Sequence, residues 1–373
     1  MNGLLLCTSD CNLRCKYCFE ETMHCGMMAA VSEIRNKFDY FLDNYFRKFL
    51  EELIDINLSL GRRETDITFH GGEPLLIGHD LLRKGCEIIK NYPNTTIGMQ
   101  TNSSLVDDEF IDIFLEYGIQ IGTSIDGPKY MHDAYRVDAA NHGSFDRVYR
   151  NILKMKEKGV PVGALATVTD RTVTSPKEFY NFFKDIHLDF SFNPCFTDPN
   201  LPKTYKPLET GAYIKFAREM FDIWINDQDS DLSITCFERI ISAMCVKKEI
   251  HMEVCSFLPD CSRTTVAIAP NGNFYRCLHY CMDDKHCIGN ITNDRLDTAL
   301  GDTQFGKRCD TLFCSDCKEC DIQSYCNGGC PYVAEALNGT IFSRPNTCAC
   351  QKDIVHYIYD YYKQFIRTEP AKE

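Results

Sequence analysis

Strand-like and helix-like segments alternate along roughly the first 230 residues, and this rhythm constrains the fold more than any other feature of the chain. The apolar runs have the length of buried strands, and helical patterns separate them. Short connections between such units predict an α/β fold with a parallel sheet, either a partial barrel or a doubly wound sheet, which periodicity alone does not separate. The predicted strands are Leu4–Cys7, Ile67–His70, Ile97–Gln100, Ile119–Ser124, Val162–Val168 and Leu188–Phe192.

The helical patterns between these strands carry start and stop signals. Several begin at a residue type that caps helix N-termini. Gly118 and Gly159 mark helix ends that lead directly into strands. The predicted helices are Ser32–Leu58, Asp80–Lys90, Asp107–Tyr117, Ser144–Lys158 and Ser175–Asp185, and the expected capping residues are Ser32, Asp80, Asp107 and Ser144.

The pattern changes after about Ser233. Thr264–Ile268 and Phe274–Cys277 have the character of strands, and Asn271–Gly272 between them is a strong hairpin-turn signal. We therefore place a domain boundary near residue 230, which gives domains 1–230 and 231–373. Further helices are expected at Gly211–Asn226, as a linker, and at Asp353–Phe365, as the last element.

The 22 cysteines are informative because nothing in the sequence indicates export. Met1–Leu6 lacks a positive region and is too short for a signal peptide. No apolar run approaches the roughly 20 residues of a membrane span. We therefore expect a cytoplasmic protein without a membrane partner, in which closely spaced cysteines indicate metal rather than disulfides. The net charge of -13 argues against nucleic acid as the main partner, because such partners select a basic surface.

Three of these cysteines, Cys11, Cys15 and Cys18, follow the first predicted strand with the spacing C-x3-C-x2-C. Cubane iron–sulfur clusters normally take four thiolates, so three thiolates leave one iron open to another ligand. Such an arrangement is typical of a reactive centre. Zinc is the alternative, since His24 or Cys25 could complete a site of four ligands.

This spacing, with Tyr17 before the third cysteine, resembles the radical SAM superfamily, and the resemblance extends over essentially the whole chain. It implies a partial (β/α)6 TIM-like barrel in which S-adenosylmethionine (SAM) binds the open iron of a [4Fe–4S] cluster. One electron then cleaves SAM to a 5′-deoxyadenosyl radical, which abstracts hydrogen from a substrate.

The resemblance also assigns residues at the carboxyl ends of the strands, where such barrels have their active sites. Two departures from the family pattern are Ser103, where relatives usually carry glycine, and the sequence around Phe192, which lacks the glycine-centred adenine motif. The motif Gly71-Gly72-Glu73 would bind the methionine amino group, Tyr17 would present its backbone to the adenine, and Asn102, Ser124 and Arg136 are further expected SAM contacts.

The C-terminal third carries a second cysteine system that resembles the seven-cysteine signature of SPASM domains. Eight thiolates can hold two four-coordinate clusters. Cys350 competes with Cys348 for the last position, and two zinc ribbons are the alternative. Resemblance to anaerobic sulfatase-maturating enzymes implies one auxiliary [4Fe–4S] cluster on Cys255, Cys261, Cys277 and Cys330, and another on Cys317, Cys320, Cys326 and Cys348.

Fully ligated clusters suit electron transfer, so the three clusters together fit a net oxidation. SPASM proteins of this pattern mostly modify ribosomally made peptides or a protein side chain. Sulfatase maturases oxidise cysteine or serine to formylglycine, using an aspartate base directly after the cysteine that matches Cys277. Leu278 occupies that position here, which favours a thioether or carbon–carbon crosslink in a peptide. His279 and, as a weaker candidate, Asp126 are the possible bases.

Three hypotheses therefore stand. The first is a radical SAM maturase that oxidises a peptide, and the second is an anaerobic sulfatase maturase with a relocated base. The third is a non-enzymatic iron–sulfur electron carrier or zinc scaffold. The expected partners of the enzyme are a ribosomally synthesised peptide or protein substrate and a small electron donor such as ferredoxin or flavodoxin. Leader recognition, where needed, is expected from the barrel or from a separate protein.

Overall fold

The computed structural model describes residues 1–18, 29–195, 205–245, 261, 264–281, 284–301, 304–313, 315 and 317–365. The chain divides into two compact units that alternate along the sequence. Unit 1 comprises Met1–Thr167, Asp198–Lys206 and Asp260–Gly306, and unit 2 comprises Val168–Thr197, Pro207–Pro259 and Lys307–Glu373. The predicted domains 1–230 and 231–373 stay a prediction.

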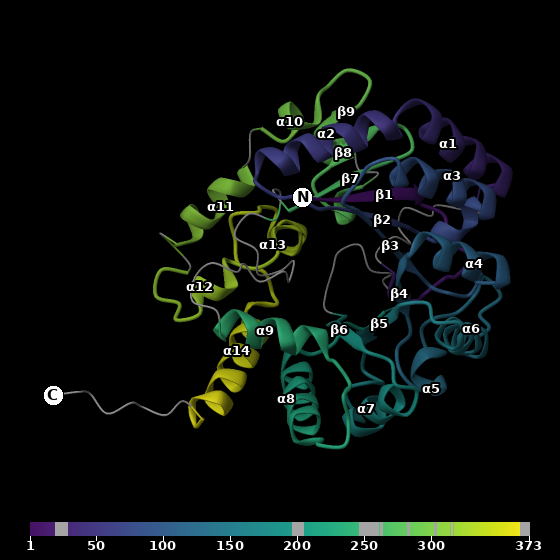
Figure 1. The fold of residues 1–373 in the computed structure, drawn as a ribbon. Helices are drawn as coiled ribbons and strands as arrows, with labels where there is room; N and C mark the ends of the chain where they lie inside the picture. The colour runs from purple at the N-terminus through teal and green to yellow at the C-terminus, as the bar shows by residue number, and fades with distance from the viewer. Residues whose placement is uncertain are drawn as a thin grey trace. The chain divides into compact units, whose positions relative to one another are not determined.

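Unit 1 is built on a largely parallel sheet in which the strands follow the order β5-β4-β3-β2-β1-β7-β8-β9 (Figure 1). Neighbouring strands from β5 to β7 are parallel, and β7, β8 and β9 pair antiparallel. Each predicted strand of this part is present within a few residues of its expected bounds. The strands are β1 (Asn2–Thr8), β2 (Thr65–Gly71), β3 (Thr95–Thr101), β4 (Gln120–Ser124), β5 (Val162–Val168), β7 (Thr265–Ile268), β8 (Asn273–Tyr275) and β9 (Gly289–Asn290).

The predicted hairpin of β7 and β8 extends this sheet. Asn2 of β1 lies opposite Thr265 of β7, and Leu5 lies opposite Ile268. Gly272 in the hairpin turn has φ 85°, a left-handed conformation that glycine adopts without steric cost. Residues more than 250 positions apart in the sequence therefore form one parallel ladder.

The helices of unit 1 have buried apolar faces and largely match the predicted ranges. Asp107 is an N-cap as expected, because its side chain accepts the N–H of Phe110 at 3.0 Å. The predicted helix Ser32–Leu58 is instead two helices, interrupted at Tyr45 with φ -124°. The helices are α1 (Val31–Asn44), α2 (Phe46–Ser59), α3 (His79–Lys90), α4 (Asp108–Tyr117), α5 (Lys129–His132), α6 (Phe145–Glu157) and α10 (Leu296–Ala299), with short 3-10 turns at Pro74–Ile77, Leu278–Tyr280 and Asp284–His286.

The N-cap predictions at Ser32 and Asp80 differ from the structure, whereas Ser144 occupies the predicted N-cap position of α6 without a capping side-chain hydrogen bond. Helices α1 and α3 begin after Ala30 and Gly78, so Ser32 and Asp80 lie inside the first turn. Ser144 precedes α6, but its hydroxyl bonds with the ring of His132 at 2.8 Å rather than capping the helix. At Ser144, a partner twelve residues away has replaced the local cap.

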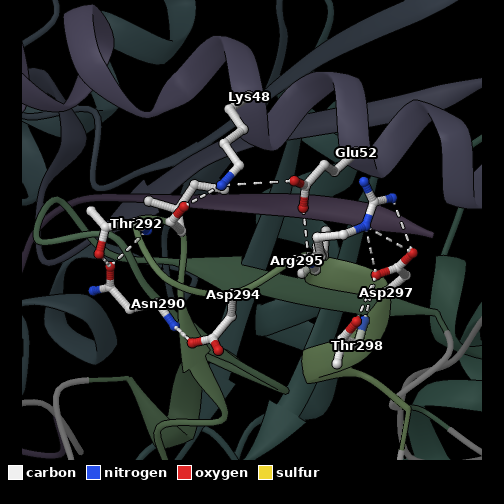
Figure 2. A network of polar contacts seen from close by, with 10 residues as sticks. Lys48, Glu52, Asn290, Thr292, Asp294, Arg295, Asp297 and Thr298 are labelled. Atoms are coloured by element: carbon white, nitrogen blue, oxygen red, sulfur yellow. Dashed lines mark hydrogen bonds and ion pairs between the residues drawn. The ribbon is translucent and has the colours of Figure 1, made fainter.

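Two side chains of α2 fasten the segment after β8 (Figure 2). Glu52 is only 8% exposed and accepts the N–H of Leu296, at the start of α10, at 2.6 Å. Lys48 donates to the carbonyl of Ile291 at 2.6 Å. These two hydrogen bonds to backbone groups thus hold the segment from Ile291 to Leu296 against α2 of the same unit.

Unit 2 has a core of aromatic rings around β6. Phe183 stacks on Phe190 with ring centroids 4.1 Å apart, and Phe192 packs edge-on against Phe216. Among the described helices, none has both the length and the apolar character needed to cross a membrane. The elements are α7 (Pro176–Asp185), β6 (Phe190–Pro194), α8 (Thr210–Asn226), α9 (Thr235–Cys245), α11 (Gln304–Phe313), α12 (Gln323–Cys326), α13 (Pro331–Asn338) and α14 (Cys348–Lys363).

Candidate active site

The predicted cluster loop, Cys11–Cys18, leaves the end of β1 and runs beside the segment that follows α5. Arg14 donates its N–H to the carbonyl of Val137 at 2.6 Å, and Lys16 donates to Tyr135 at 2.9 Å. Within the loop, the N–H of Cys18 reaches the carbonyl of Cys15 at 2.9 Å. Backbone hydrogen bonds thus fix the path of the three thiols in unit 1.

The two motif glycines allow the end of β2 to approach the start of this loop. A Cβ atom on Gly71 would lie 2.3 Å from the carbonyl oxygen of Thr8, and one on Gly72 would lie 2.2 Å from that of Asp10. The N–H of Gly72 donates to Thr8 at 2.9 Å. Any larger residue would push β2 and the cluster loop apart, so the close backbone approach requires glycine at both positions.

Glu73 is fully buried and accepts three hydrogen bonds. Its Oε1 atom takes the hydroxyl of Thr101 at 2.7 Å and the N–H of Leu75 at 3.1 Å, and Oε2 takes the N–H of Asn102 at 2.8 Å. Burial raises the pKa of Glu73 to about 7, although these donors oppose the rise. Glu73 therefore joins the ends of β2 and β3.

Asn102 continues this connection to the thiols. Its amide nitrogen lies 3.7 Å from Cys11 Sγ and donates to Asn12 Oδ1 at 3.0 Å. Glu73 holds the backbone N–H of Asn102, and the side-chain amide of Asn102 is directed at the cluster loop. An amide N–H beside a thiolate is a group that stabilises the anionic sulfur of a metal ligand.

Tyr17, Asp126 and Arg136 form a buried group beside Cys15. The Asp126 carboxylate accepts Arg136 Nε at 2.9 Å and Nη2 at 3.2 Å, and it also accepts the Tyr17 hydroxyl. Burial raises the pKa of the Cys15 thiol, and the guanidinium of Arg136 works against that rise. The structure therefore places three of the predicted site residues in one cluster of contacts.

Ser124 lies at the end of β4, where Gln100 Nε2 approaches its hydroxyl at 3.4 Å. Ser103, which departs from the family pattern, has φ 57°, the left-handed region in which a glycine would be unstrained. Its hydroxyl is 2.6 Å from that of Thr123, a neighbouring buried side chain. That hydrogen bond offsets part of the cost of the serine backbone conformation.

His70 is a site residue that the sequence reasoning did not single out. Its pKa is lowered to about 4 because its ring is removed from water and because His279 lies nearby. The Nδ1 atom accepts the N–H of Gly71 at 2.8 Å, so the neutral ring carries its proton on Nε2. The available signal was its position directly before the Gly-Gly pair. The predicted base His279 thus lies near the end of β2.

A cavity of about 240 Å³ in unit 2 brings together the cysteines predicted for the second auxiliary cluster. Cys317, Cys320, Cys326 and Cys348 line it with Gln351 and other residues. Burial raises the pKa of Cys326 to about 12, and the three neighbouring thiols contribute. Four thiols around one cavity are the donor type that an iron–sulfur cluster or zinc takes, although in the described part of the chain no group of three or more His, Cys, Asp or Glu side chains is already arranged to hold a metal ion.

The competing Cys350 points elsewhere, since its Sγ atom lies 3.9 Å from the carbonyl oxygen of Thr210. The loop that follows Cys326 is held by the buried Arg308, which donates to the carbonyls of Gly328 and Gly329. The cavity wall that carries Cys326 is thus fixed by charge-assisted hydrogen bonds.

The cysteines predicted for the first auxiliary cluster are not brought together in one unit. Cys261 precedes β7 and Cys277 follows β8, both in unit 1, while Cys330 belongs to unit 2. Cys255 lies outside the described residues. This ligand set stays a prediction.

The chain is similar in sequence to known proteins along most of its length. Residues 5–188 match the Radical SAM superfamily model. A cysteine-type anaerobic sulfatase-maturating enzyme of Clostridium novyi is 27% identical over 375 residues, which cover 94% of each chain. A serine-type anaerobic sulfatase-maturating enzyme of Bacteroides thetaiotaomicron is 29% identical over 344 residues, or 86% of this chain and 80% of the relative.

Two solved structures establish the fold. Native anSMEcpe with bound AdoMet has a TM-score of 0.79 at 23% identity and covers 98% of this chain and 99% of its own. Streptococcus suis SuiB bound to precursor peptide SuiA has a TM-score of 0.62 at 16% identity, with 94% and 75% covered. These likenesses confirm the predicted α/β fold class.

The chain therefore contains a radical SAM domain, as the spacing of Cys11, Cys15 and Cys18 predicts. This family implies a [4Fe–4S] cluster and SAM, and the three thiols, with the neighbouring Asn102 amide and Arg136 guanidinium, are the groups that would hold them. Its long alignments, at 27% and 29% identity, are with anaerobic sulfatase-maturating enzymes.

Proposed function

We propose that this enzyme oxidises a cysteine or serine side chain of a peptide or protein to formylglycine, as an anaerobic sulfatase maturase. The observation that carries the proposal is the alignment over 94% of both chains with a cysteine-type maturase. It supports the sulfatase alternative better than the crosslinking reaction expected from Leu278. Peptides occupy the related structures of anSMEcpe with Cp18Cys and of SuiB with SuiA, which supports a peptide substrate here.

The cluster loop and the strand ends carry the initiation chemistry in this proposal. When bound, the reduced [4Fe–4S] cluster and SAM supply a 5′-deoxyadenosyl radical that takes a hydrogen atom from the substrate. Cys11, Cys15 and Cys18 would hold the cluster, and Gly71-Gly72, Tyr17, Asn102, Ser124 and Arg136 would line the SAM site. Glu73 would act by positioning Asn102, because its carboxylate is occupied by three donors.

The substrate radical must then lose one proton and one electron to become the aldehyde carbon of a serine substrate or the thioaldehyde carbon of a cysteine substrate. Water would hydrolyse the thioaldehyde to the aldehyde and release hydrogen sulfide. We assign the proton to His279, which follows Leu278 and lies near His70 at the end of β2. An imidazole is a competent acceptor near neutral pH. The electron needs a redox centre, and the four-thiol cavity lined by Cys326 and Cys348 is suited to hold one. A small protein such as ferredoxin or flavodoxin would supply the initiating electron.

Crosslinking of a peptide remains the second candidate, because Leu278 lacks the carboxylate that sulfatase maturases use. The two reactions differ in their products. Formylglycine is an aldehyde that reacts with a hydrazide probe, whereas a thioether or carbon–carbon crosslink does not. When the substrate residue is cysteine, formylglycine formation also removes the sulfur, and a thioether retains it.

The test is to incubate the anaerobically reconstituted enzyme, SAM and a reductant with sulfatase active-site peptides that carry cysteine or serine. We expect a peptide product that reacts with a hydrazide. Loss of two hydrogens without hydrazide reactivity would support the crosslinking alternative instead. Formation of 5′-deoxyadenosine with no change in either peptide would contradict the sulfatase proposal while leaving the radical SAM domain intact.

A further inference from the structure

Asp126 has no remaining role in the chemistry above, although it is one of the most completely buried carboxylates in the described part of unit 1. Asp126 comes two residues after the end of β4 and is 1% exposed. Its Oδ1 atom accepts the N–H of Thr167 at 2.8 Å and Arg136 Nη2 at 3.2 Å. Its Oδ2 atom accepts Arg136 Nε at 2.9 Å and the Tyr17 hydroxyl.

This geometry does not suit the base role suggested from the sequence. A base must present an oxygen to the proton that it removes. Each oxygen of Asp126 already accepts two donors, and one partner is a guanidinium bound through both oxygens. Such a paired carboxylate fixes the orientation of its donors.

The groups that Asp126 holds are parts of the SAM and cluster site. Tyr17 lies within the cluster loop, between Cys15 and Cys18, and its buried ring lies 5.4 Å from the guanidinium carbon of Arg136. Arg136 in turn lies beside the thiol of Cys15. Thr167 belongs to the end of β5. One carboxylate therefore connects the cluster loop, Arg136 and the end of a strand.

We propose that Asp126 is a positioning residue that sets the orientation of Tyr17 and Arg136, and through them the SAM-binding geometry of the cluster loop. The proposal rests on the radical SAM domain and is independent of the peptide that the enzyme oxidises. Arg136 without its carboxylate partner would be a buried charge free to turn toward other acceptors, and Tyr17 would lose its hydroxyl acceptor. Misplacement of a substrate-positioning group by about 1 Å costs up to about a hundredfold in rate.

The experiment compares Asp126→Asn with the wild-type enzyme, both full length and anaerobically reconstituted. Iron content, SAM affinity by equilibrium dialysis and the low-temperature EPR spectrum of the reduced cluster are measured without any peptide. We expect nearly unchanged iron, a weakening of SAM binding by about tenfold or more, and a smaller SAM-induced change in the EPR spectrum. The matched control is Glu52→Gln, which also neutralises a buried carboxylate that accepts a backbone N–H in unit 1 but belongs to the network of α2 and the segment after β8 (Figure 2).

A second variant, Tyr17→Phe, tests the positioning role of Asp126 if Asp126→Asn does not fold. It removes one hydrogen bond to the carboxylate and keeps the buried ring. We expect the same changes in SAM affinity and EPR spectrum at smaller size, and partial recovery in Asp126→Glu, which restores the charge. Wild-type SAM binding and spectra in Tyr17→Phe would overturn the proposal. So would an Asp126→Asn enzyme that binds and cleaves SAM normally but fails to oxidise peptide, because that result would make Asp126 a base.

Discussion

The Oε2 atom of Glu73 accepts the backbone N–H of Asn102 at 2.8 Å, although one residue follows β2 and the other follows β3. Asn102 then directs its amide at Cys11 Sγ, 3.7 Å away. The acidic residue of the Gly-Gly-Glu motif thus acts on the cluster loop through a neighbouring strand. Its pKa of about 7 means that this connection depends on pH.

The substitution Glu73→Gln tests that dependence. A carboxyl whose pKa rises from 4.5 unfolded to about 7 folded binds more protons in the folded state, so its contribution to stability is fully present below pH 4.5 and is lost as the pH rises through about 7. The size is on the order of 3 kcal/mol. We expect the wild-type apoprotein to lose unfolding free energy between about pH 5 and pH 8 in urea titrations, and the glutamine variant to lose less. Equal slopes for the two proteins would contradict the assignment.

Ser103 offers a test of backbone strain beside the site. Ser103→Ala keeps the left-handed conformation and removes the hydrogen bond to Thr123, whereas Ser103→Gly removes both the bond and the strain. We expect the alanine variant to be less stable than wild type by about 1 kcal/mol and the glycine variant to exceed the alanine variant by about 1 kcal/mol. Thermal or urea unfolding of the three proteins measures both differences. An alanine variant as stable as the glycine variant would show that the conformation is unstrained.

Cys348 and Cys350 form a matched pair for the second auxiliary cluster. Both belong to the first turn of α14, yet only Cys348 lines the four-thiol cavity, and Cys350 approaches the carbonyl of Thr210. We expect Cys348→Ala to lose the iron and sulfide of about one cluster after reconstitution and Cys350→Ala to retain them. Iron analysis with Mössbauer spectroscopy measures the loss. Equal iron in the two variants would remove Cys348 from the ligand set.

His279 is the proposed base, and its effect should be confined to the second half of the reaction. We expect His279→Ala to form 5′-deoxyadenosine in the presence of peptide while aldehyde formation falls by about a hundredfold or more, within the range for loss of a general base. His286→Ala, on the same segment and with its ring packed at a tilt against Tyr280, is the control. The double variant Leu278→Asp/His279→Ala should recover aldehyde, because it restores the family's carboxylate. Full activity of His279→Ala would exclude the base role.

The sequence predicted the strands from Leu4–Cys7 to Val162–Val168 well, because buried strands followed by amphipathic helices leave a local signal. It did not predict the pairing of β1 with β7, since parallel ladders between distant segments leave no local pattern. The break at Tyr45 was also missed, because both halves of the predicted helix are apolar on one face.

The site residues likewise divide into those with a local sequence signal and those that depend on contacts between distant segments. The cysteine spacings predicted Cys11 and its two partners as one ligand set and grouped Cys348 with three cysteines that line the same cavity, because metal ligands repeat at fixed intervals. The positioning roles of Asp126 and Glu73 depend on hydrogen-bond donors that other strands supply. Only the folded chain shows these donors beside the two carboxylates. The nearness of His70 to His279 likewise joins two segments about 200 residues apart.

The most direct test of the radical SAM assignment is the amount of 5′-deoxyadenosine formed when the anaerobically reconstituted enzyme receives SAM and a strong reductant. Wild-type enzyme is predicted to produce it, and a variant with Cys11, Cys15 and Cys18 all replaced by alanine is predicted to produce none. Product from the triple variant, or none from an iron-replete wild-type enzyme, would contradict the assignment of this loop as the radical-generating site.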